Sequence, residues 1–327
     1  RLAGEQKGSN ARKIGLSGQS EIEDLSSNYA SVESVVQLRN NRYSVIPNGH
    51  EDKKLGIDSW FASENFFDFF GFPLVRGTAD RVLSDPNAIV ITESAATRLF
   101  GDDDPIGKTL TLDASSFKKD LVVTGIAQDR KDSHIQFEAI IPWSMKAPDG
   151  RHIAHMWFQR SLYAYVKTVD PNQIDAVASQ MNQPLIESGD IESWEYFFQP
   201  LSDIYLGSND IQFLAFESGN AQTVQTLFYI AIIILLVACI NYVNLQTAKG
   251  TRRSLEVGVR KVLGAEKGQL IRQFLAESVV LTLFASVLAV LLIDLALPAF
   301  NGLTGKTFTT TDLIDQGCFH HSTLQLY

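Results

Sequence analysis

The sequence predicts an α+β extracytoplasmic domain of mixed strands and short helices, followed by an α-helical transmembrane region with two spans and an amphipathic cytoplasmic segment. Three observations predict this class. Short strand-like and helical runs alternate up to about Pro200, two long apolar runs follow, and a basic stretch separates those two runs. The alternation lacks a strict βαβ repeat, which favours α+β over a doubly wound parallel sheet.

The first domain is expected over residues 31–218, and the elements in it follow the apolar pattern. Strands are predicted over 32–38, 54–61, 88–92, 109–113, 121–126, 137–142, 161–168 and 196–205. Helices are predicted over 64–70, 93–100 and 170–186, with Thr92 as an N-cap and Pro171 in a first turn. Residues 1–30 are polar, rich in Gly and Ser and without periodicity, so we expect a poorly ordered end.

The transmembrane region is expected over residues 219–300. Its apolar runs cover about 226–247 and 277–297, and a helix needs roughly 20 apolar residues to cross a bilayer. Residues 301–327 are polar and predict an irregular tail. The boundary near Ser218 is where the surroundings of the chain change from water to lipid.

The segment between the spans, residues 248–276, is strongly basic. Seven Lys and Arg residues against Glu256 and Glu266 give it a net charge of +5, whereas the whole chain carries −9. Positively charged loops remain in the cytoplasm, so residues 1–218 should lie on the other face of the membrane. Lipid, and not nucleic acid, is the expected partner of these charges, because the segment is held between two spans.

The same segment has a helical apolar stripe. Val259, Val262 and Leu263 share one face, Gly264 interrupts the helix, and a second stripe resumes over 270–275. This pattern predicts an amphipathic helix that lies at the membrane interface and bends into the second span. Membrane anchoring and docking of a partner both fit the pattern.

The sequence contains segments that resemble enzyme motifs, but their residues are not spaced as those motifs require. GDDDPIGKT at Gly101–Thr109 is one residue too long for a phosphate-binding loop, its aspartates would repel phosphate, and a helix precedes it where a strand should. We predict an acidic turn that leads into a strand. His152 and His155 lack a third ligand at metal-site spacing, and Cys239 and Cys318 are poorly placed for a disulfide. No catalytic, metal or cofactor site is expected.

Three separated blocks of the sequence carry a family resemblance. They are FFDFFGFPLVRG, then DPNAIVITESAATRLFGDDDPIGKTL with VTGIAQDRKDSHIQFEAIIP, and finally NYVNLQTAKGTRRSLEVGVRKVLGAEKGQLIRQFLAES. In this order they resemble the FtsX/MacB-like permease family, the membrane subunits of a class of bacterial ABC transporters. The resemblance covers residues 31 to 306 and implies a periplasmic core domain followed by an FtsX-like transmembrane region.

The resemblance also implies partners and a site. Members pair with a separate or fused ABC ATP-binding subunit at the cytoplasmic face, and two permease subunits make a complex. The family's basic motif, the contact with the ATPase, corresponds here to Glu256, Gly258, Arg260, Lys261, Gly264 and Ala265. The implied function is a permease subunit of the mechanotransmission type in a bacterial inner membrane, which couples ATP hydrolysis by the partner to movement of the periplasmic domain in export or efflux.

An alternative function is a membrane-anchored periplasmic sensor or ligand-binding module without transport activity. Co-purification with an ATP-binding subunit separates the two. Family members also have a membrane helix before the core domain and a further span after it, so we expect this chain to be a fragment.

Overall fold

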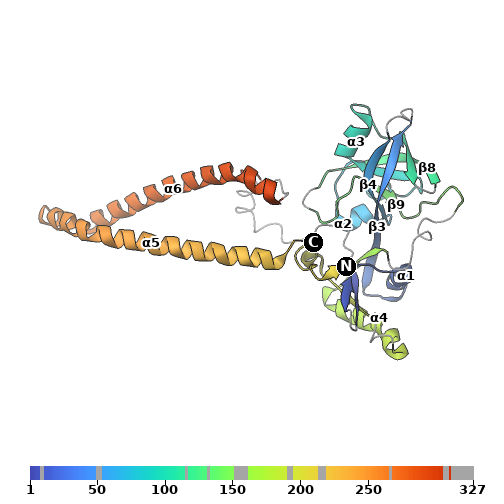
Figure 1. Ribbon diagram of the computed structural model, residues 1–327, viewed down its shortest axis with the longest axis horizontal. Coiled ribbons are helices and arrows are strands. Elements are labelled where there is room, and N and C mark those ends of the chain that lie inside the picture. Colours follow the sequence, from blue (N-terminus) through green and yellow to red (C-terminus); the bar gives the residue numbers. More distant parts are fainter. Residues whose placement is uncertain are drawn as a thin grey trace. The chain divides into compact units, whose positions relative to one another are not determined.

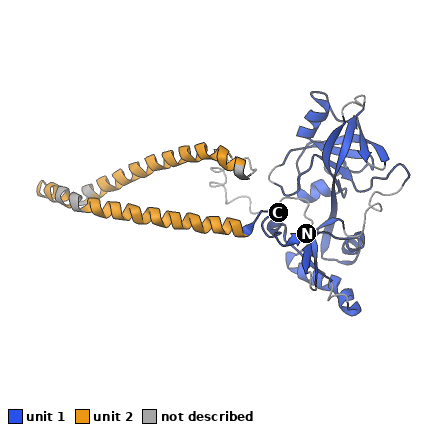
Figure 2. Cartoon of the chain, in the orientation of Figure 1, with its two compact units in different colours: residues 1–221 blue, residues 222–327 orange. Residues whose placement is uncertain are grey.

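The computed structural model describes residues 1–7, 11–48, 54–114, 117–130, 133–150, 161–189, 194–212, 219–264, 267–304 and 309–310. It divides into two compact units, Arg1–Ala221 and Gln222–Tyr327 (Figure 2). The first unit is a mixed α+β domain and the second consists of two long helices, as the fold class predicts (Figure 1). Each unit is described by itself.

Six strands of the first unit pair in a closed ring. They are β3 (Val32–Pro47), β4 (Leu55–Ala62), β9 (Ala139–Pro142), β6 (Ala88–Thr92), β8 (Phe117–Ala127) and β7 (Thr109–Ala114). β3 pairs with β4, β4 with β9, β9 with β6, β6 with β8, β8 with β7, and β7 with β3 again. The short strand β5 (Leu74–Arg76) joins the outer side of β8. A closed ring leaves few unpaired strand edges.

The strand β6 has the largely apolar sequence AIVIT because both of its faces are buried. Ile89 and Ile91 belong to a core with Val45, Phe61 and residues of β7 and β8, and α3 (Glu93–Phe100) contributes to this core. Val90 points to the opposite face and belongs to a second core. Since side chains of a strand alternate between faces, a strand covered on both faces has no polar side.

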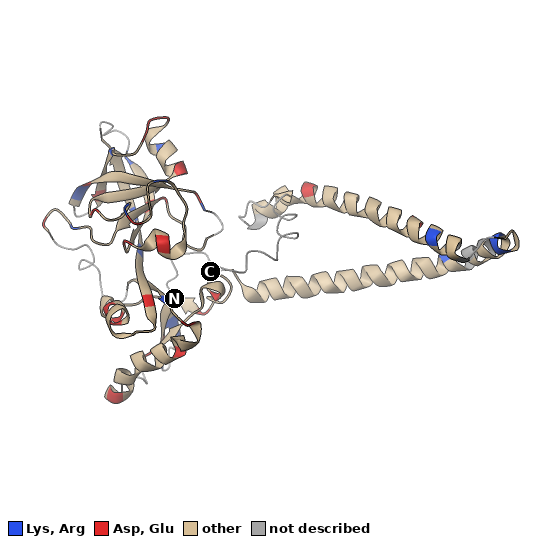
Figure 3. Cartoon of the chain, turned by 180° about the vertical axis from the view of Figure 1, so that it is seen from behind, with Lys and Arg blue, Asp and Glu red and all other residues tan. Residues whose placement is uncertain are grey.

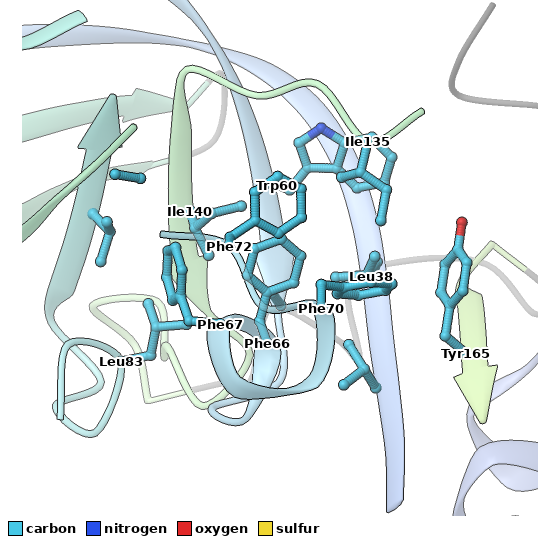
Figure 4. Close-up of a cluster of buried hydrophobic side chains, with 14 of the residues drawn as sticks. Leu38, Trp60, Phe66, Phe67, Phe70, Phe72, Leu83, Ile135, Ile140 and Tyr165 are labelled. Carbon is cyan, nitrogen blue, oxygen red and sulfur yellow. The ribbon is translucent and has the colours of Figure 1, made fainter. Parts of the chain in front are cut away.

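The second core is an aromatic cluster around the short helix α2 (Phe66–Phe70). Phe66 lies at its centre, with ring centroids 5.1 Å from Phe67, 5.3 Å from Phe70 and 5.3 Å from Phe72 (Figure 4). Gly71 ends the helix at φ 62°, a conformation that costs glycine little, and so turns Phe72 back onto Phe66. The predicted helix over 64–70 and its end at Gly71 are confirmed.

A second part of the sheet extends from β3. β10 (Tyr163–Thr168) pairs with β3 and β1 (Leu2–Gln6), and β1 also pairs with β2 (Arg12–Ile14) and β11 (Trp194–Phe198). The two-residue strand β12 (Ile211–Gln212) closes this side. Helices α1 (Gln19–Asn28) and α4 (Ile174–Ser188) contribute Leu25 and Val177 to a third core with Leu2.

This arrangement corrects the expectation of a poorly ordered end at residues 1–30. Leu2 and Leu25 are fully buried, and besides β2, β1 pairs with β10 and β11, which are more than 150 residues away in the sequence. The order of this segment comes from long-range pairing, which leaves no local periodicity to detect. The first compact unit therefore begins at Arg1 and not near residue 31.

Most other predicted elements are confirmed, although several differ in length, among them β8, which begins at Phe117 and not at residue 121. β6 and α3 have the predicted bounds, and Thr92 caps α3 by accepting a hydrogen bond from Ala95 N at 3.3 Å. β3 runs to Pro47 instead of residue 38, because its polar second half pairs with β4 and β7. The strand predicted over 196–205 is wrong beyond Phe198, since Pro200 follows and 201–203 form a 3₁₀ turn.

The acidic turn after α3 is confirmed as a lead into β7. Gly101 and Gly107 have φ of 63° and 77°, so glycines allow the chain to turn at both ends of the loop. Asp104 accepts a hydrogen bond from Arg76 at 2.6 Å, and that bond lowers the pKa of Asp104. Lys108, the residue that would bind phosphate in a P-loop, forms an ion pair with Asp103 at 2.7 Å.

Candidate functional site

The second unit is a helical hairpin made of α5 (Ala221–Val262) and α6 (Lys267–Thr304). Two stretches of it, Ala221–Gly250 and Ile271–Gly302, are long and apolar enough to cross a membrane and contain the two predicted spans. Their large apolar side chains are exposed, which suits contact with lipid or with other membrane helices. Residues 301–304 of the predicted tail are helical, and most of the remainder lies outside the described residues.

Helix α5 continues well beyond its apolar stretch. At 1.5 Å per residue, its 42 residues span about 63 Å, roughly twice the 30 Å of bilayer hydrocarbon. Residues 251–262 continue α5 as one helix, so the predicted amphipathic segment begins as an extension of the first span. Its place at the membrane interface stays a prediction. No Pro interrupts the sequence here, so the backbone hydrogen-bond ladder has no reason to stop.

Residues 251–273, named here the hairpin tip, contain the last turns of α5, the connecting turn and the first turns of α6. Lys and Arg gather there, while the long stretches of α5 and α6 that lead to the tip carry few charges (Figure 3). Arg260 and Lys261 occupy the last turn of α5, where cations interact favourably with the negative end of the helix dipole.

Gly264 ends α5, as predicted. Its φ is 91°, and its N–H donates to the carbonyl of Lys261 at 3.1 Å while that of Leu263 donates to Val259 at 3.1 Å. A residue with a Cβ is strained at this φ, so glycine allows the chain to leave the helix and reverse. The turn then places Gln273 of α6 beside Arg260, whose Nη1 donates to Gln273 Oε1 at 2.6 Å.

The predicted site residues are distributed along this tip. Gly258 lies exposed on α5, and a Cβ built there would meet no heavy atom of the described residues within 4 Å. Lys261 is exposed, Arg260 is half-buried against α6, and Glu256 lies in α5 without a described side chain. Ala265 lies outside the described residues, as do His152, His155 and Cys318. Sequence reasoning missed Gln273, because only the folded turn brings it to Arg260.

Among the described residues, no group of three His, Cys, Asp or Glu side chains is placed to hold a metal ion. A partly buried polar contact lies instead in the first unit, where His134 Nε2 is 3.0 Å from Tyr165 Oη. Burial, followed by the positive charge of Arg1, lowers the pKa of His134 to about 4. Burial raises the pKa of Tyr165, so this pair is neutral at pH 7.

A folded domain joined to an apolar helical hairpin with a basic tip defines a membrane protein with a water-exposed domain. The MacB-like periplasmic core domain model matches residues 4–183, and the FtsX-like permease C-terminal model matches residues 228–315. The chain belongs to the family of ABC transporter permeases that combine these two domains, which places its first domain in the periplasm and its hairpin in the inner membrane.

Relatives support this assignment. The chain is 24% identical over 230 residues to the macrolide export ATP-binding/permease protein MacB of Neisseria gonorrhoeae, an alignment that covers 69% of this chain and 33% of that protein. It is 27% identical over 239 residues to the uncharacterized ABC transporter permease YvrN of Bacillus subtilis, covering 70% of this chain and 54% of YvrN. The chain thus spans about a third of the length of the MacB relatives it matches.

Solved structures with a similar domain include the periplasmic region of MacB from Actinobacillus actinomycetemcomitans. That structure is 19% identical, with a TM-score of 0.43, and the match covers 62% of this chain and 89% of the other. A domain of a permease protein from Porphyromonas gingivalis is 20% identical, with a TM-score of 0.47, over 62% of this chain and 91% of the other.

Proposed function

We propose that this chain is the permease part of an ABC transporter of the mechanotransmission type, driven by an ATP-binding subunit or domain that docks on the hairpin tip. The observation that carries the proposal is the continuity of α5, which runs from the membrane-spanning stretch into the basic tip as one helix. A rigid helix that reaches from lipid into water can carry a displacement at its tip into the membrane.

Two further observations support a docking role. The tip is basic, with a net charge of +4 over 251–273, so it suits an acidic surface. A glycine inside a helix, such as Gly258, destabilises the helix by roughly 0.5–1 kcal/mol relative to alanine. No described atom lies within 4 Å of where a Cβ at Gly258 would be, so packing inside this chain does not require a glycine there. A bare glycine allows close approach of a partner backbone. The MacB relatives are named as combined ATP-binding and permease proteins, which suggests that the partner of this chain is an ATP-binding subunit or domain.

In this proposal the chain performs no catalysis itself. Glu256, Gly258, Arg260, Lys261, Gly264 and Ala265 make or shape the contact, and the periplasmic domain moves with the spans to act in export or efflux. A second permease subunit and membrane lipid complete the assembly.

The test is isolation of the native complex from membranes, followed by ATPase assay in lipid nanodiscs. We expect an ATP-binding subunit or domain to accompany the chain, and Arg260→Glu to abolish stimulation of its ATP hydrolysis while membrane insertion persists. A chain that inserts normally but isolates without any ATP-binding component would favour the sensor or ligand-binding alternative. Unchanged stimulation in Arg260→Glu would contradict the role of the tip.

A further inference from the structure

The turn of the hairpin tip exposes two apolar side chains. Val262 is 88% exposed and Leu263 is 81% exposed, the two highest values among the large apolar side chains in the described part of the chain. Val262 ends α5 and Leu263 follows it directly, three and four positions after Val259, which is 56% exposed. Isolated apolar residues on a surface need no explanation, but three so closely spaced at the end of a hairpin form a compact apolar knob.

Lipid is not positioned to cover this knob. The apolar stretch of α5 ends at Gly250, and Val262 lies twelve residues further along the same helix, about 18 Å at 1.5 Å per residue. The headgroup layer adds only about 5–8 Å to each side of the hydrocarbon. Basic residues 252 and 253 mark the water boundary between the two points. The knob therefore stands in water unless a protein covers it.

Charge around the knob indicates the chemistry of that protein. Lys261, next to Val262, is exposed, and the tip as a whole is basic. Arg260, in contrast, is half-buried and donates to Gln273 across the turn. Lys261 is thus available to a partner, whereas the guanidinium of Arg260 ties α5 to α6 and fixes the direction in which the knob points.

We propose that Val262 and Leu263 are the anchor by which the ATP-binding subunit grips the tip, seated in an apolar pocket rimmed by carboxylates, and that Arg260 is a positioning residue that acts through Gln273. This inference rests on the function proposed above. According to this inference, most of the binding free energy of the contact comes from the two apolar residues and not from the charged residues of the motif. Buried apolar anchors dominate interfaces, while rim charges mainly set association rate and salt dependence.

The first experiment measures binding of the ATP-binding subunit, purified from the native complex, to the full chain in nanodiscs. Val262→Ser combined with Leu263→Ser removes apolar area without adding charge. We expect the apparent affinity to fall roughly a hundredfold, with an unchanged dependence on salt. Val169→Ser, at a position 71% exposed in the first unit, is the matched control and should bind like the wild type. Lys261→Gln should lower affinity a few-fold and weaken the salt dependence.

The second experiment separates positioning from contact. Arg260→Glu places a carboxylate beside Gln273 and should lose ATPase stimulation, and adding Gln273→Arg should restore most of it by re-forming the bond with reversed polarity. No recovery in this double variant would overturn the positioning role, since a direct contact to the partner stays lost. Wild-type affinity in the Val262 and Leu263 variant would overturn the anchor. Failure of the wild type itself to bind an ATP-binding subunit would instead refute the proposed function.

Discussion

Asn182 of α4 closes the free edge of strand β11. Its side chain donates to the carbonyl of Tyr196 at 2.9 Å and accepts from the N–H of Tyr196 at 2.8 Å, as a neighbouring strand would. Asn182 is buried, and Gly4 of β1 lies opposite Tyr196 in the register. One amide thus blocks an edge where another chain could pair.

Asn182→Asp removes the donor and leaves a carboxylate against the Tyr196 carbonyl. We expect the first unit to lose about 1–3 kcal/mol of unfolding free energy, the cost of unsatisfied buried polar groups. Denaturation followed by tryptophan fluorescence reports this, because Trp60, Trp143, Trp157 and Trp194 all lie in the first unit. Gln180→Glu, an exposed amide-to-acid change on the same helix, is the control and should cost little. Equal stability of the two variants would contradict the edge-closing role.

His134 makes the stability of the first unit depend on pH. Its pKa in the folded protein is lowered to about 4, chiefly by burial, so the unfolded chain binds the proton more readily. Stability is fully present above about pH 6.5 and falls as pH drops toward 4, by at most about 3.4 kcal/mol at 1.36 kcal/mol per pKa unit. Unfolding midpoints measured between pH 7 and 4 should fall less in His134→Gln. Parallel pH profiles for the two proteins would show that another group controls this range.

At the scale of elements, the proposed mechanical coupling depends on the continuity of α5 beyond its apolar stretch. Ser254→Pro removes a hydrogen bond and adds a clash inside the helix, a cost of about 3 kcal/mol that produces a kink or break between span and tip. We expect the ATP-binding subunit to remain bound, because the tip keeps its side chains, while stimulation of ATP hydrolysis falls strongly. Ser254→Ala, which preserves the helix, should behave like the wild type. Equal stimulation in the two variants would mean that a rigid link is unnecessary.

Local sequence signals predicted the elements that depend on local chemistry. β6 and α3 follow from an apolar run, a threonine cap and a helical stripe, and the end of α5 follows from Gly264. The N-terminal strand β1 was missed because its residues LAGEQ gain their order from β10 and β11, far away in the sequence. The Arg260–Gln273 contact cannot be read from the sequence either, since twelve residues separate the two and only the fold brings them together.

At the scale of the whole molecule, two units of opposite character are joined in one chain. Residues 1–221 form a domain with buried aromatic and aliphatic cores, whereas the hairpin exposes its apolar side chains along two stretches that suit a membrane. The charge follows this division, because the chain carries −9 overall and its 248–276 segment carries +5. We propose that the hairpin tip is the site at which ATP hydrolysis by the partner is coupled to movement of the permease.

A photo-crosslinking amino acid at position 263 tests that claim most directly, in the full-length protein and in its own membranes. The account predicts a light-dependent adduct with the ATP-binding subunit, identified by mass spectrometry, that is absent when the crosslinker replaces the exposed Leu281 in the apolar stretch of α6. An adduct of position 263 with lipid alone, in membranes where the ATP-binding subunit is present, would contradict the account.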